Sequence, residues 1–299
     1  MKRQLGNLIA FTLLALLAAC SKPATGGVSK SADAADAFQE KSIARVGLVK
    51  QIALTFDDGP SAAHTMALLD ILERENVKAT FFLNGKNVKG NEAILKRMHD
   101  DGHVIANHGQ DHEHLPTVAK EKGMRALFHQ VQDTHLLIKP FIQPGGRMYF
   151  RAPFGAWKSS FAPYLNEDQV LRDYIGPMFW DIGGEISRDP KTKQIAVDAN
   201  GNPYTSADWD CWTIRNGKQT LTLKQCAAGY FNETTKRNGG IILMHDKTAQ
   251  TVEMAAKLIP IWKRQGFKFI TLDEIKSLDQ YANESAVIAA KAQQQRLVK

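Results

Sequence analysis

The feature that most constrains this chain is a series of short apolar segments separated by stretches of helical periodicity. Seven segments have the composition of buried strands: residues 52–56, 79–83, 103–106, 148–151, 178–181, 240–244 and 267–270. Strands that alternate with helices imply parallel βαβ units. About seven such units predict an α/β fold, a distorted (β/α) barrel with about seven parallel strands rather than an open sheet.

The intervening stretches predict helices. Met66, Leu69 and Leu72 have the spacing of one helical face, and residues 118–138 predict one long helix. Residues 183–239 interrupt this alternation, because they contain no clear βα unit.

Two turn signals lie in the 183–239 region. Asn200-Gly201 and Asn216-Gly217 are typical of hairpin turns. The region therefore reads as a loop and hairpin insertion over the mouth of the barrel. Cys211 and Cys226 lie within it and predict a disulfide that staples the insertion, the alternative being two buried free thiols.

The net charge of the chain limits the kinds of molecule that it is expected to bind. The 299 residues carry a formal net charge of +7. This excess suits a polyanionic neighbour such as a cell wall, and it suits equally a mildly basic solvated surface. Lysine and arginine are scattered and are not interleaved with aromatic residues, so no nucleic-acid interface is expected.

The N-terminus has the organisation of an export signal. Lys2 and Arg3 precede the apolar residues 8–19, which are too few to span a bilayer comfortably. The ending Leu17-Ala18-Ala19-Cys20 resembles a bacterial lipoprotein cleavage box, which implies a signal peptide over 1–19 and acylation of Cys20. The alternative is an ordinary signal peptide with a chance cysteine.

Ser21 follows the cysteine, and in Gram-negative bacteria this resembles lipoproteins sent to the periplasmic face of the outer membrane. Residues 20–48 are then expected to be a flexible tether, because residues 21–45 contain few large apolar residues. The folded domain is expected over 49–280, with 281–299 as a helical or disordered tail.

A metal site is suggested by residues that follow predicted strands. His108 and His112 stand four residues apart, a spacing that suits a divalent ion. Asp58 follows another strand and supplies a third candidate ligand. Two histidines and one carboxylate leave positions open on the ion, as a catalytic site requires. His114 has the wrong spacing and is expected to be a surface or supporting residue.

Asp57 and His245 complete a possible acid–base pair. Asp57 and Asp58 are adjacent in sequence, and the side chains of adjacent residues at the end of a strand point in different directions. One of them is therefore expected to bind the metal and the other to act as general base. The alternative is that both carboxylates cap the turn at Gly59-Pro60. His245 ends an apolar strand and is either a core histidine or the general acid. Arg151 would then keep Asp57 ionised, and Asp208 would orient His245.

Five separated motifs now resemble, in order, those of the polysaccharide deacetylases with a NodB-like domain, carbohydrate esterase family four. They are Thr55-Phe56-Asp57-Asp58-Gly59-Pro60, His108-Gly109-Gln110-Asp111-His112, Arg151-Ala152-Pro153-Phe154, Asp208-Trp209 and Leu243-Met244-His245. The resemblance covers about residues 50–275. It implies Asp57 as base, Asp58, His108 and His112 as metal ligands, and His245 as acid.

The same resemblance implies the surroundings of the reacting group. A backbone N–H near Phe154 would line the oxyanion hole, Trp209 would wall the groove, and Leu243 would line the acetyl pocket. The implied cofactor is one divalent ion, zinc with cobalt as an alternative. The implied reaction is removal of N-acetyl groups from an amino-sugar polymer such as peptidoglycan, a chitin-type chain or poly-N-acetylglucosamine. Separately, the protein is expected to be a monomer, held at the membrane through the lipid anchor at Cys20.

Two departures from the family pattern bear on the site. Gly109 stands where the family usually has Ser or Thr that braces the loop. Asp208-Trp209 comes late, after the insertion, so Asp181 is a rival partner for His245. Three other functions stay open: an O-acetyl xylan esterase with the same site, an amidase for small amides, and a non-catalytic glycan-binding lipoprotein.

Overall fold

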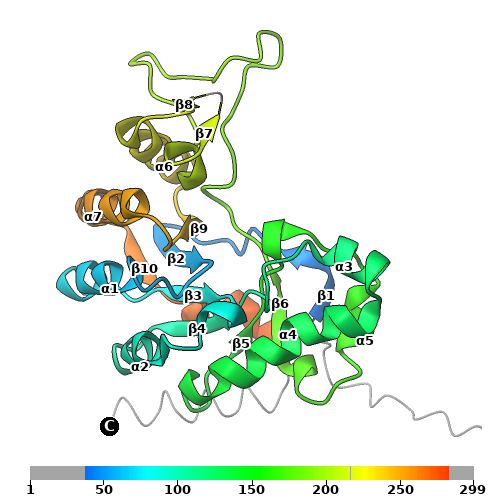
Figure 1. Ribbon diagram of the computed structural model, residues 1–299. Coiled ribbons are helices and arrows are strands. Elements are labelled where there is room, and N and C mark those ends of the chain that lie inside the picture. Colours follow the sequence, from blue (N-terminus) through cyan, green and yellow to red (C-terminus); the bar gives the residue numbers. More distant parts are fainter. Residues whose placement is uncertain (1–37, 216, 283–299) are drawn as a thin grey trace, which may run out of the picture. The chain divides into compact units, whose positions relative to one another are not determined.

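The computed structural model describes residues 38–282 apart from residue 216, and Figure 1 shows its helices and strands. The strands are β1 (Phe38–Ile43), β2 (Gln51–Asp57), β3 (Thr80–Leu83), β4 (Val104–Asn107), β5 (Met148–Tyr149), β6 (Tyr174–Met178), β7 (Ile214–Arg215), β8 (Lys218–Gln219), β9 (Gly240–His245) and β10 (Lys268–Ile270). The helices are α1 (Thr65–Arg74), α2 (Glu92–Asp100), α3 (Leu115–Glu121), α4 (Met124–Ile138), α5 (Phe161–Leu165), α6 (Leu223–Arg237) and α7 (Ala249–Arg264). In this part of the chain no helix combines the length and the apolar character needed to cross a membrane.

Strand β2 is the centre of the larger sheet. It pairs in parallel with β9 along six residues, with β3 near its end and with β10 near its start, and β4 extends the sheet beyond β3. Residues 52–57 are all buried, as expected for a parallel strand covered on both faces. The sheet therefore brings the carboxyl ends of β2, β3, β4 and β9 to one edge.

A smaller parallel sheet accompanies the larger one. Its strand order is β1-β6-β5. Single bridges join the segments that follow β5 and β6 to the larger sheet, Phe150 with Asn107 and Ile182 with Ile242. The parallel α/β fold is as predicted, and its barrel is distorted because these two joints are isolated bridges rather than continuous ladders.

The helices cover the outside of the strands, with α1, α2 and α7 beside the larger sheet and α3, α4 and α5 beside the smaller one (Figure 1). The long helix predicted over 118–138 is instead two helices. Gly123, with a φ of 85°, separates α3 from α4, a conformation that glycine adopts without strain. Leu69 and Leu72 are buried in α1 as predicted, whereas Met66 is 39% exposed and Leu68 is buried in its place.

Two strands differ from prediction. The fifth strand was expected over 178–181, but β6 ends at Met178. Gly176 and Pro177 argue against a strand at this place in the sequence, because both residues are rare within strands. The strand was therefore predicted too late in the chain. The prediction of a tether over 20–48 is wrong for residues 38–43, which form β1 beside β6, with Phe38 buried against Phe150. The predicted signal peptide, Cys20 and residues 283–299 lie outside the described residues.

In the insertion over 183–239, β7 pairs antiparallel with β8, as the predicted hairpin requires; Asn216 of the predicted turn lies outside the described residues. Val197 and Pro203 form a bridge around the turn at Asn200-Gly201. The insertion also holds helix α6, which was not predicted. A capping box between Thr222 and Gln225 starts this helix, a signal that is readable in the sequence.

The predicted disulfide joins Cys211, at the end of the turn Asp208–Cys211, to Cys226 in α6. Replacing both cysteines with serine is expected to lower the free energy of unfolding by about 3 kcal/mol, because the unfolded chain regains the entropy of an open loop. Urea unfolding of the oxidised protein, the reduced protein and the double variant measures the effect. An unchanged midpoint in all three would contradict it.

Candidate active site

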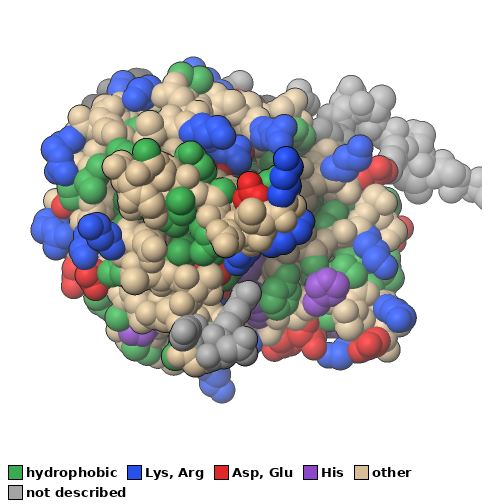
Figure 2. Space-filling model, turned by 90° about the horizontal axis from the view of Figure 1, so that it is seen from above, with side chains coloured by type: hydrophobic (Ala, Val, Ile, Leu, Met, Phe, Trp, Pro, Cys, Tyr) green, Lys and Arg blue, Asp and Glu red, His purple; other side chains and the backbone are tan. Residues whose placement is uncertain are grey.

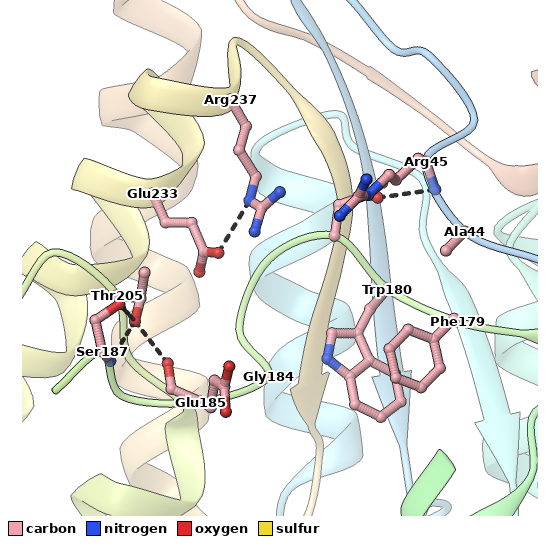
Figure 3. A pocket seen from close by; sticks show the side chains of 11 residues that line it. Ala44, Arg45, Phe179, Trp180, Gly184, Glu185, Ser187, Thr205, Glu233 and Arg237 are labelled. Carbon is pink, nitrogen blue, oxygen red and sulfur yellow. Dashed lines mark hydrogen bonds and ion pairs between the residues drawn. The ribbon is translucent and has the colours of Figure 1, made fainter. Parts of the chain in front are cut away.

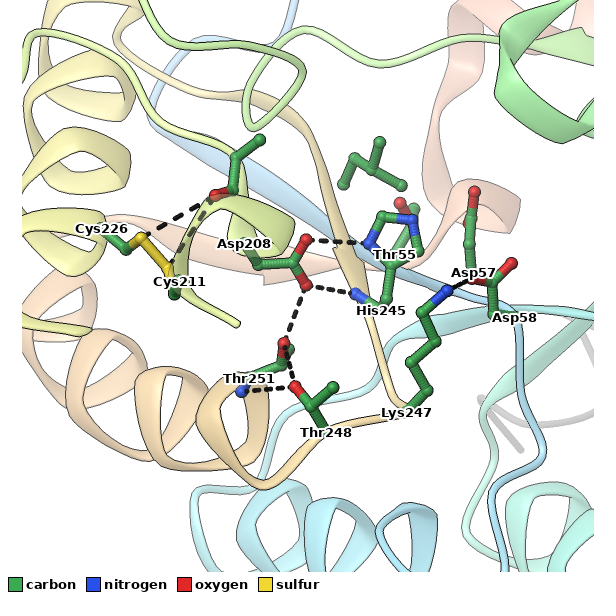
Figure 4. A network of polar contacts seen from close by, with 12 residues as sticks. Thr55, Asp57, Asp58, Asp208, Cys211, Cys226, His245, Lys247, Thr248 and Thr251 are labelled. Carbon is green, nitrogen blue, oxygen red and sulfur yellow. Dashed lines mark hydrogen bonds and ion pairs between the residues drawn. A yellow bond between two sulfur atoms is a disulfide. The ribbon is translucent and has the colours of Figure 1, made fainter. Parts of the chain in front are cut away.

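The predicted catalytic residues meet at the edge of the larger sheet. Asp57 and His245 are directly paired at the ends of β2 and β9. Asp58 follows Asp57, and His108 follows the last residue of β4. Figure 4 shows Asp57, Asp58 and His245 on neighbouring elements. From above, Figure 2 shows histidine surface within a hollow that basic and hydrophobic side chains border.

Asp58, His108 and His112 form a cluster that could hold a metal ion, because one ligand atom from each lies within 4.8 Å of the others. Nε2 of His112 is 3.0 Å and Nε2 of His108 is 3.5 Å from Asp58 Oδ1. Nδ1 of His108 lies 2.9 Å from the carbonyl oxygen of Arg151. That contact is a hydrogen bond when Nδ1 carries the proton, which leaves the Nε2 lone pair for an ion. The residues present therefore fit a divalent metal.

Electrostatics favour the ligand forms of His108 and Asp58. Burial lowers the pKa of His108 more than the neighbouring Asp57 and Asp58 carboxylates raise it, so the imidazole is neutral. Burial raises the pKa of Asp58, but the hydrogen bond from His112 and the surrounding imidazoles outweigh burial. The pKa of Asp58 therefore lies well below its usual range. Neutral imidazole and ionised carboxylate are the forms that bind metal.

The loop that carries His112 has Gly109 where the family usually has a Ser or Thr hydroxyl, and other side chains stabilise this loop. Gly109 has a φ of 79°, and its N–H donates to Asn107 Oδ1 at 2.9 Å. The amide of Gln130 accepts from the backbone of Asp111 at 3.0 Å and donates to its carboxylate at 2.9 Å. Asn107 and Gln130 thus supply bracing contacts to this loop.

Three residues of the site have left-handed backbone conformations although they are not glycine. The φ angles are 77° for Asp58, 57° for His112 and 61° for Phe154. Such conformations cost roughly 1–2 kcal/mol in an L-residue. Their concentration at one place is typical of functional sites, where the surrounding structure enforces them.

Arg151 is buried and holds Asp57. Its Nη1 donates to Asp57 Oδ1 at 2.6 Å and to Thr55 Oγ1 at 2.9 Å, and its Nη2 donates to the carbonyl of Phe179 at 3.3 Å. Burial lowers the pKa of Arg151 from its usual value, while Asp57 opposes the shift. The contact predicted between Arg151 and Asp57 is present, and it leaves Asp57 Oδ2 on the side of His108.

Asp208 is the carboxylate that contacts His245. Its Oδ1 lies 2.8 Å from His245 Nδ1, and its Oδ2 accepts from the His245 backbone N–H at 2.7 Å (Figure 4). Burial alone would lower the pKa of His245, but the charge and hydrogen bond of Asp208 raise it to about 9. The rival Asp181 instead accepts from the backbone N–H groups of Arg45 and Ile241.

Aromatic rings surround the charged groups. The Phe154 ring is centred 4.5 Å from that of His112, and the rings of Trp209 and Trp212 are centred 5.5 Å and 5.8 Å from His245. Leu243 lies two residues before His245 on β9, so both side chains project from the same face. The structure thus brings every predicted catalytic, ligand and supporting residue to one region.

Three polar residues of this site were not predicted from the sequence. Thr251, in the first turn of α7, donates to Asp208 Oδ2 at 2.9 Å. The Lys247 ammonium pairs with Asp58 Oδ2, and burial raises the pKa of Asp246 to about 7. Asp246 and Lys247 directly follow His245 in the sequence, and this position could have identified them as residues of the site. No local pattern marks Thr251.

Replacing His112 with alanine is expected to weaken zinc binding by at least about 100-fold, because one of three protein ligands is lost. The neighbouring His114→Ala variant is the matched control and is expected to bind zinc normally, since His114 contacts Thr117 at the start of α3. Competition with a chromogenic chelator measures both affinities. Equal affinities would exclude His112 as a ligand.

The chain is similar to several known proteins. Residues 46–170 match the family described as polysaccharide deacetylase. The peptidoglycan-N-acetylglucosamine deacetylase PgdA of Listeria monocytogenes is 31% identical over 232 residues, which are 76% of this chain and 39% of that protein. The chain therefore spans less than half the length of that relative.

Two further similarities cover most of both chains. The chitin deacetylase of Colletotrichum lindemuthianum is 30% identical over 75% of this chain and 78% of its own. The structure of the peptidoglycan deacetylase PdaC from Bacillus subtilis has the same fold, with a TM-score of 0.54 and 23% identity over 83% of this chain and 97% of that one. On this evidence the chain belongs to the polysaccharide deacetylase family.

Proposed function

We propose that this protein is a metal-dependent N-deacetylase that hydrolyses acetamido groups of an amino-sugar polymer at the bacterial cell envelope. The observation that carries the proposal is the pairing of Asp57 with His245 across the ends of β2 and β9, beside the Asp58, His108 and His112 cluster. A base and an acid on either side of a ligand cluster suit addition of water to a carbonyl and departure of an amine.

The proposed general base is Asp57. The Arg151 guanidinium holds Asp57 Oδ1, so Oδ2 is available to accept a proton from the attacking water. The water oxygen bonds to the acetamide carbon as Asp57 takes the proton. A backbone N–H near Phe154 would donate to the developing oxyanion.

The proposed general acid is His245. With a pKa of about 9, its imidazole is protonated at neutral pH, and Asp208 holds Nδ1 so that Nε2 carries the proton to be donated. Protonation of the sugar nitrogen lets the carbon–nitrogen bond break. The products are acetate and a free amine; Asp57 then releases its proton to solvent, and His245 takes up a proton from solvent.

The proposed cofactor is one zinc ion, with cobalt as an alternative, held by Asp58, His108 and His112. When bound, such an ion supplies Lewis-acid polarisation of the acetamide carbonyl and lowers the pKa of water. Two imidazoles and one carboxylate are ligands that suit zinc in catalytic sites.

The proposed substrate is an acetylated cell-wall glycan, either peptidoglycan or a chitin-type chain. Support comes from the relatives, which are peptidoglycan and chitin deacetylases. The lipoprotein motif ending at Cys20 supports an anchored, exported protein, at the periplasmic face of the outer membrane. We propose that it acts there as a monomer.

The proposal is tested by incubating the full-length, zinc-loaded protein with N-acetylglucosamine oligomers, peptidoglycan and acetylated xylan. Acetate and free amine are both measured. We expect equal amounts of acetate and amine from an amino-sugar substrate. Acetate without amine would make the protein an esterase, and no acetate from any substrate, with zinc bound, would favour a glycan-binding protein.

A further inference from the structure

Asp246 is a buried carboxyl group that the mechanism proposed above does not use. It directly follows His245 and is fully buried, and in the part of the chain that the structure describes its Oδ1 has no hydrogen-bond partner. Its Oδ2 accepts from the hydroxyl of Thr65 at 2.5 Å. A buried carboxyl group with one oxygen unpaired costs stability, so the contacts that this side chain makes need an explanation.

Glu233 shows how another buried carboxyl group of this chain is satisfied. Glu233 is 6% exposed, and it accepts from the backbone N–H of Gly183 at 3.2 Å and from Arg237 Nε at 3.0 Å. Figure 3 shows the contact between Glu233 and Arg237. Among the residues described, Asp246 has no ion pair with a lysine or arginine. The difference indicates that Asp246 is placed for its contacts with the neighbouring turn rather than for its own stability.

The carboxyl group of Asp246 lies against the turn that carries Asp58. A Cβ atom at Gly59 would be 2.4 Å from Asp246 Oδ2 and 2.6 Å from Oδ1, so only glycine fits at this contact. From the segment that follows β3, the backbone N–H of Asn84 donates to the Gly59 carbonyl at 2.9 Å, and Asn87 Nδ2 donates to the Asp58 carbonyl at 2.8 Å. The turn is therefore fixed by the segment after β3 and by Asp246 at the end of β9.

Thr65 extends this contact to the start of α1. Its buried hydroxyl accepts from the backbone N–H of Ser61 at 2.7 Å and donates to Asp246 Oδ2. A hydroxyl has a single proton, so Thr65 makes both contacts only in this arrangement. Ser61, Thr65 and Asp246 thus form a hydrogen-bonded chain from the loop after Asp58 to the end of β9.

The conformation of Asp58 requires support of this kind. Its φ of 77° is disfavoured in an L-residue, so the turn would relax if the contacts that hold it were lost. Relaxation would move Asp58 Oδ1 away from Nε2 of His112 and Nε2 of His108, which lie 3.0 Å and 3.5 Å from it. Lys247 pairs with Asp58 Oδ2 but is 45% exposed, so this pair holds the carboxylate less firmly than a buried contact does.

We propose that Asp246 and Thr65 are positioning residues of the metal site, which hold the Asp58 carboxylate where a divalent ion needs it through the contact at Gly59. The inference rests on the metal ligands of the proposed function and adds to them the residues that fix one ligand in place. Because Asp246 directly follows His245, the same strand end then positions the general acid and one metal ligand.

The test measures zinc affinity in full-length variants by competition with a chromogenic chelator. Thr65→Val keeps the size of the side chain and removes its hydroxyl, whereas Thr65→Ser keeps the hydroxyl. Asp246→Ala removes the carboxyl group. The matched controls are Thr234→Val and Glu233→Ala, because both residues are buried in α6 and the Thr234 hydroxyl donates to the Tyr230 carbonyl at 2.7 Å. The visible absorption spectrum of each cobalt-loaded protein reports the geometry of the ligands.

We expect Thr65→Val and Asp246→Ala to bind zinc about tenfold more weakly than the parent, which is the lower end of the loss seen when a residue that orients a ligand is removed. The cobalt spectrum should change in both variants, because the ligand geometry changes. Thr65→Ser and the two α6 controls should match the parent in affinity and in spectrum. Urea unfolding of the metal-free proteins identifies the variants that are folded, and Thr65→Val decides if Asp246→Ala does not fold.

Three outcomes would overturn the proposal. The first is parent-like affinity and spectrum in the folded Thr65→Val variant. The second is equal weakening in the α6 controls, which would indicate a general loss of stability. The third is weak binding in Asp246→Ala with normal binding in Thr65→Val, which would leave an effect of charge and no positioning.

These measurements need no substrate, so the inference and the proposed activity fail in distinguishable ways. Zinc binding that changes as expected, in a protein that releases no acetate, would sustain the positioning role and reject the deacetylase. Acetate release with parent-like zinc binding in Thr65→Val would sustain the deacetylase and reject the positioning role. A parent protein that binds no zinc would reject the metal centre and this inference together.

Discussion

Replacing Asp57 with asparagine is expected to lower kcat by about 10²–10⁴-fold, the contribution of a positioned general base. Asparagine is similar in size and can still accept the hydrogen bond from Arg151, so the buried guanidinium keeps a partner. The amide cannot take a proton from water. The loss should therefore appear in kcat, with the fold and zinc affinity retained.

Acetate release at saturating substrate measures the Asp57→Asn effect, and zinc titration confirms that the metal site is intact. The matched control is Asp111→Asn, since Asp111 belongs to the same motif as His108 and His112 but its carboxylate contacts Gln130. Asp111→Asn should keep most of its activity. Comparable losses in both variants would reject Asp57 as the base and point to general damage of the site.

Replacing Asp208 with asparagine is expected to lower kcat on the order of 10²-fold at pH 8, by deprotonating the general acid. The parent protein should lose activity as the pH rises through about 9, the pKa of His245. Without the Asp208 charge, burial dominates and the pKa of His245 falls. The alkaline limb of the kcat profile should then move to lower pH. Asp181→Asn should leave that limb in place, because Asp181 contacts backbone groups elsewhere.

The same ion pair makes stability depend on pH. The pKa of His245 is raised from 6.5 in the unfolded chain to about 9 in the folded protein. Its contribution to the free energy of unfolding, about 3 kcal/mol, is therefore fully present below pH 6.5 and is lost as the pH rises through 9. Urea unfolding between pH 6 and 10 should show this loss in the parent and not in Asp208→Asn. A parallel loss in both proteins would reject the pairing.

Much of the barrel and of its site could be predicted, because strand composition and strand-end chemistry are local signals. The strands that carry Asp57, His108 and His245 are runs of apolar residues that end in polar ones. Parallel pairing then brings those ends together without any further information. The order of the five motifs along the chain then indicated the family and the role of each residue.

The elements that were missed have weak or misleading local signals. β1 lies in a segment of mixed polarity and is identified by its pairing with β6, which is distant in sequence. β6 itself contains Gly176 and Pro177, and Thr251 reaches Asp208 across 43 positions of sequence. The choice between Asp181 and Asp208 likewise depended on the path of the insertion. These features depend on tertiary contacts, which composition and periodicity do not encode.

The left-handed conformations of Asp58, His112 and Phe154 have a consequence for laboratory evolution. Each is disfavoured in an L-residue by roughly 1–2 kcal/mol, although aspartate tolerates it better than phenylalanine does. The residues proposed to hold a metal and to line the oxyanion hole therefore work against thermal stability. Selection for heat resistance alone should enrich glycine or asparagine at these three positions, and the survivors should melt at higher temperature while hydrolysing less substrate.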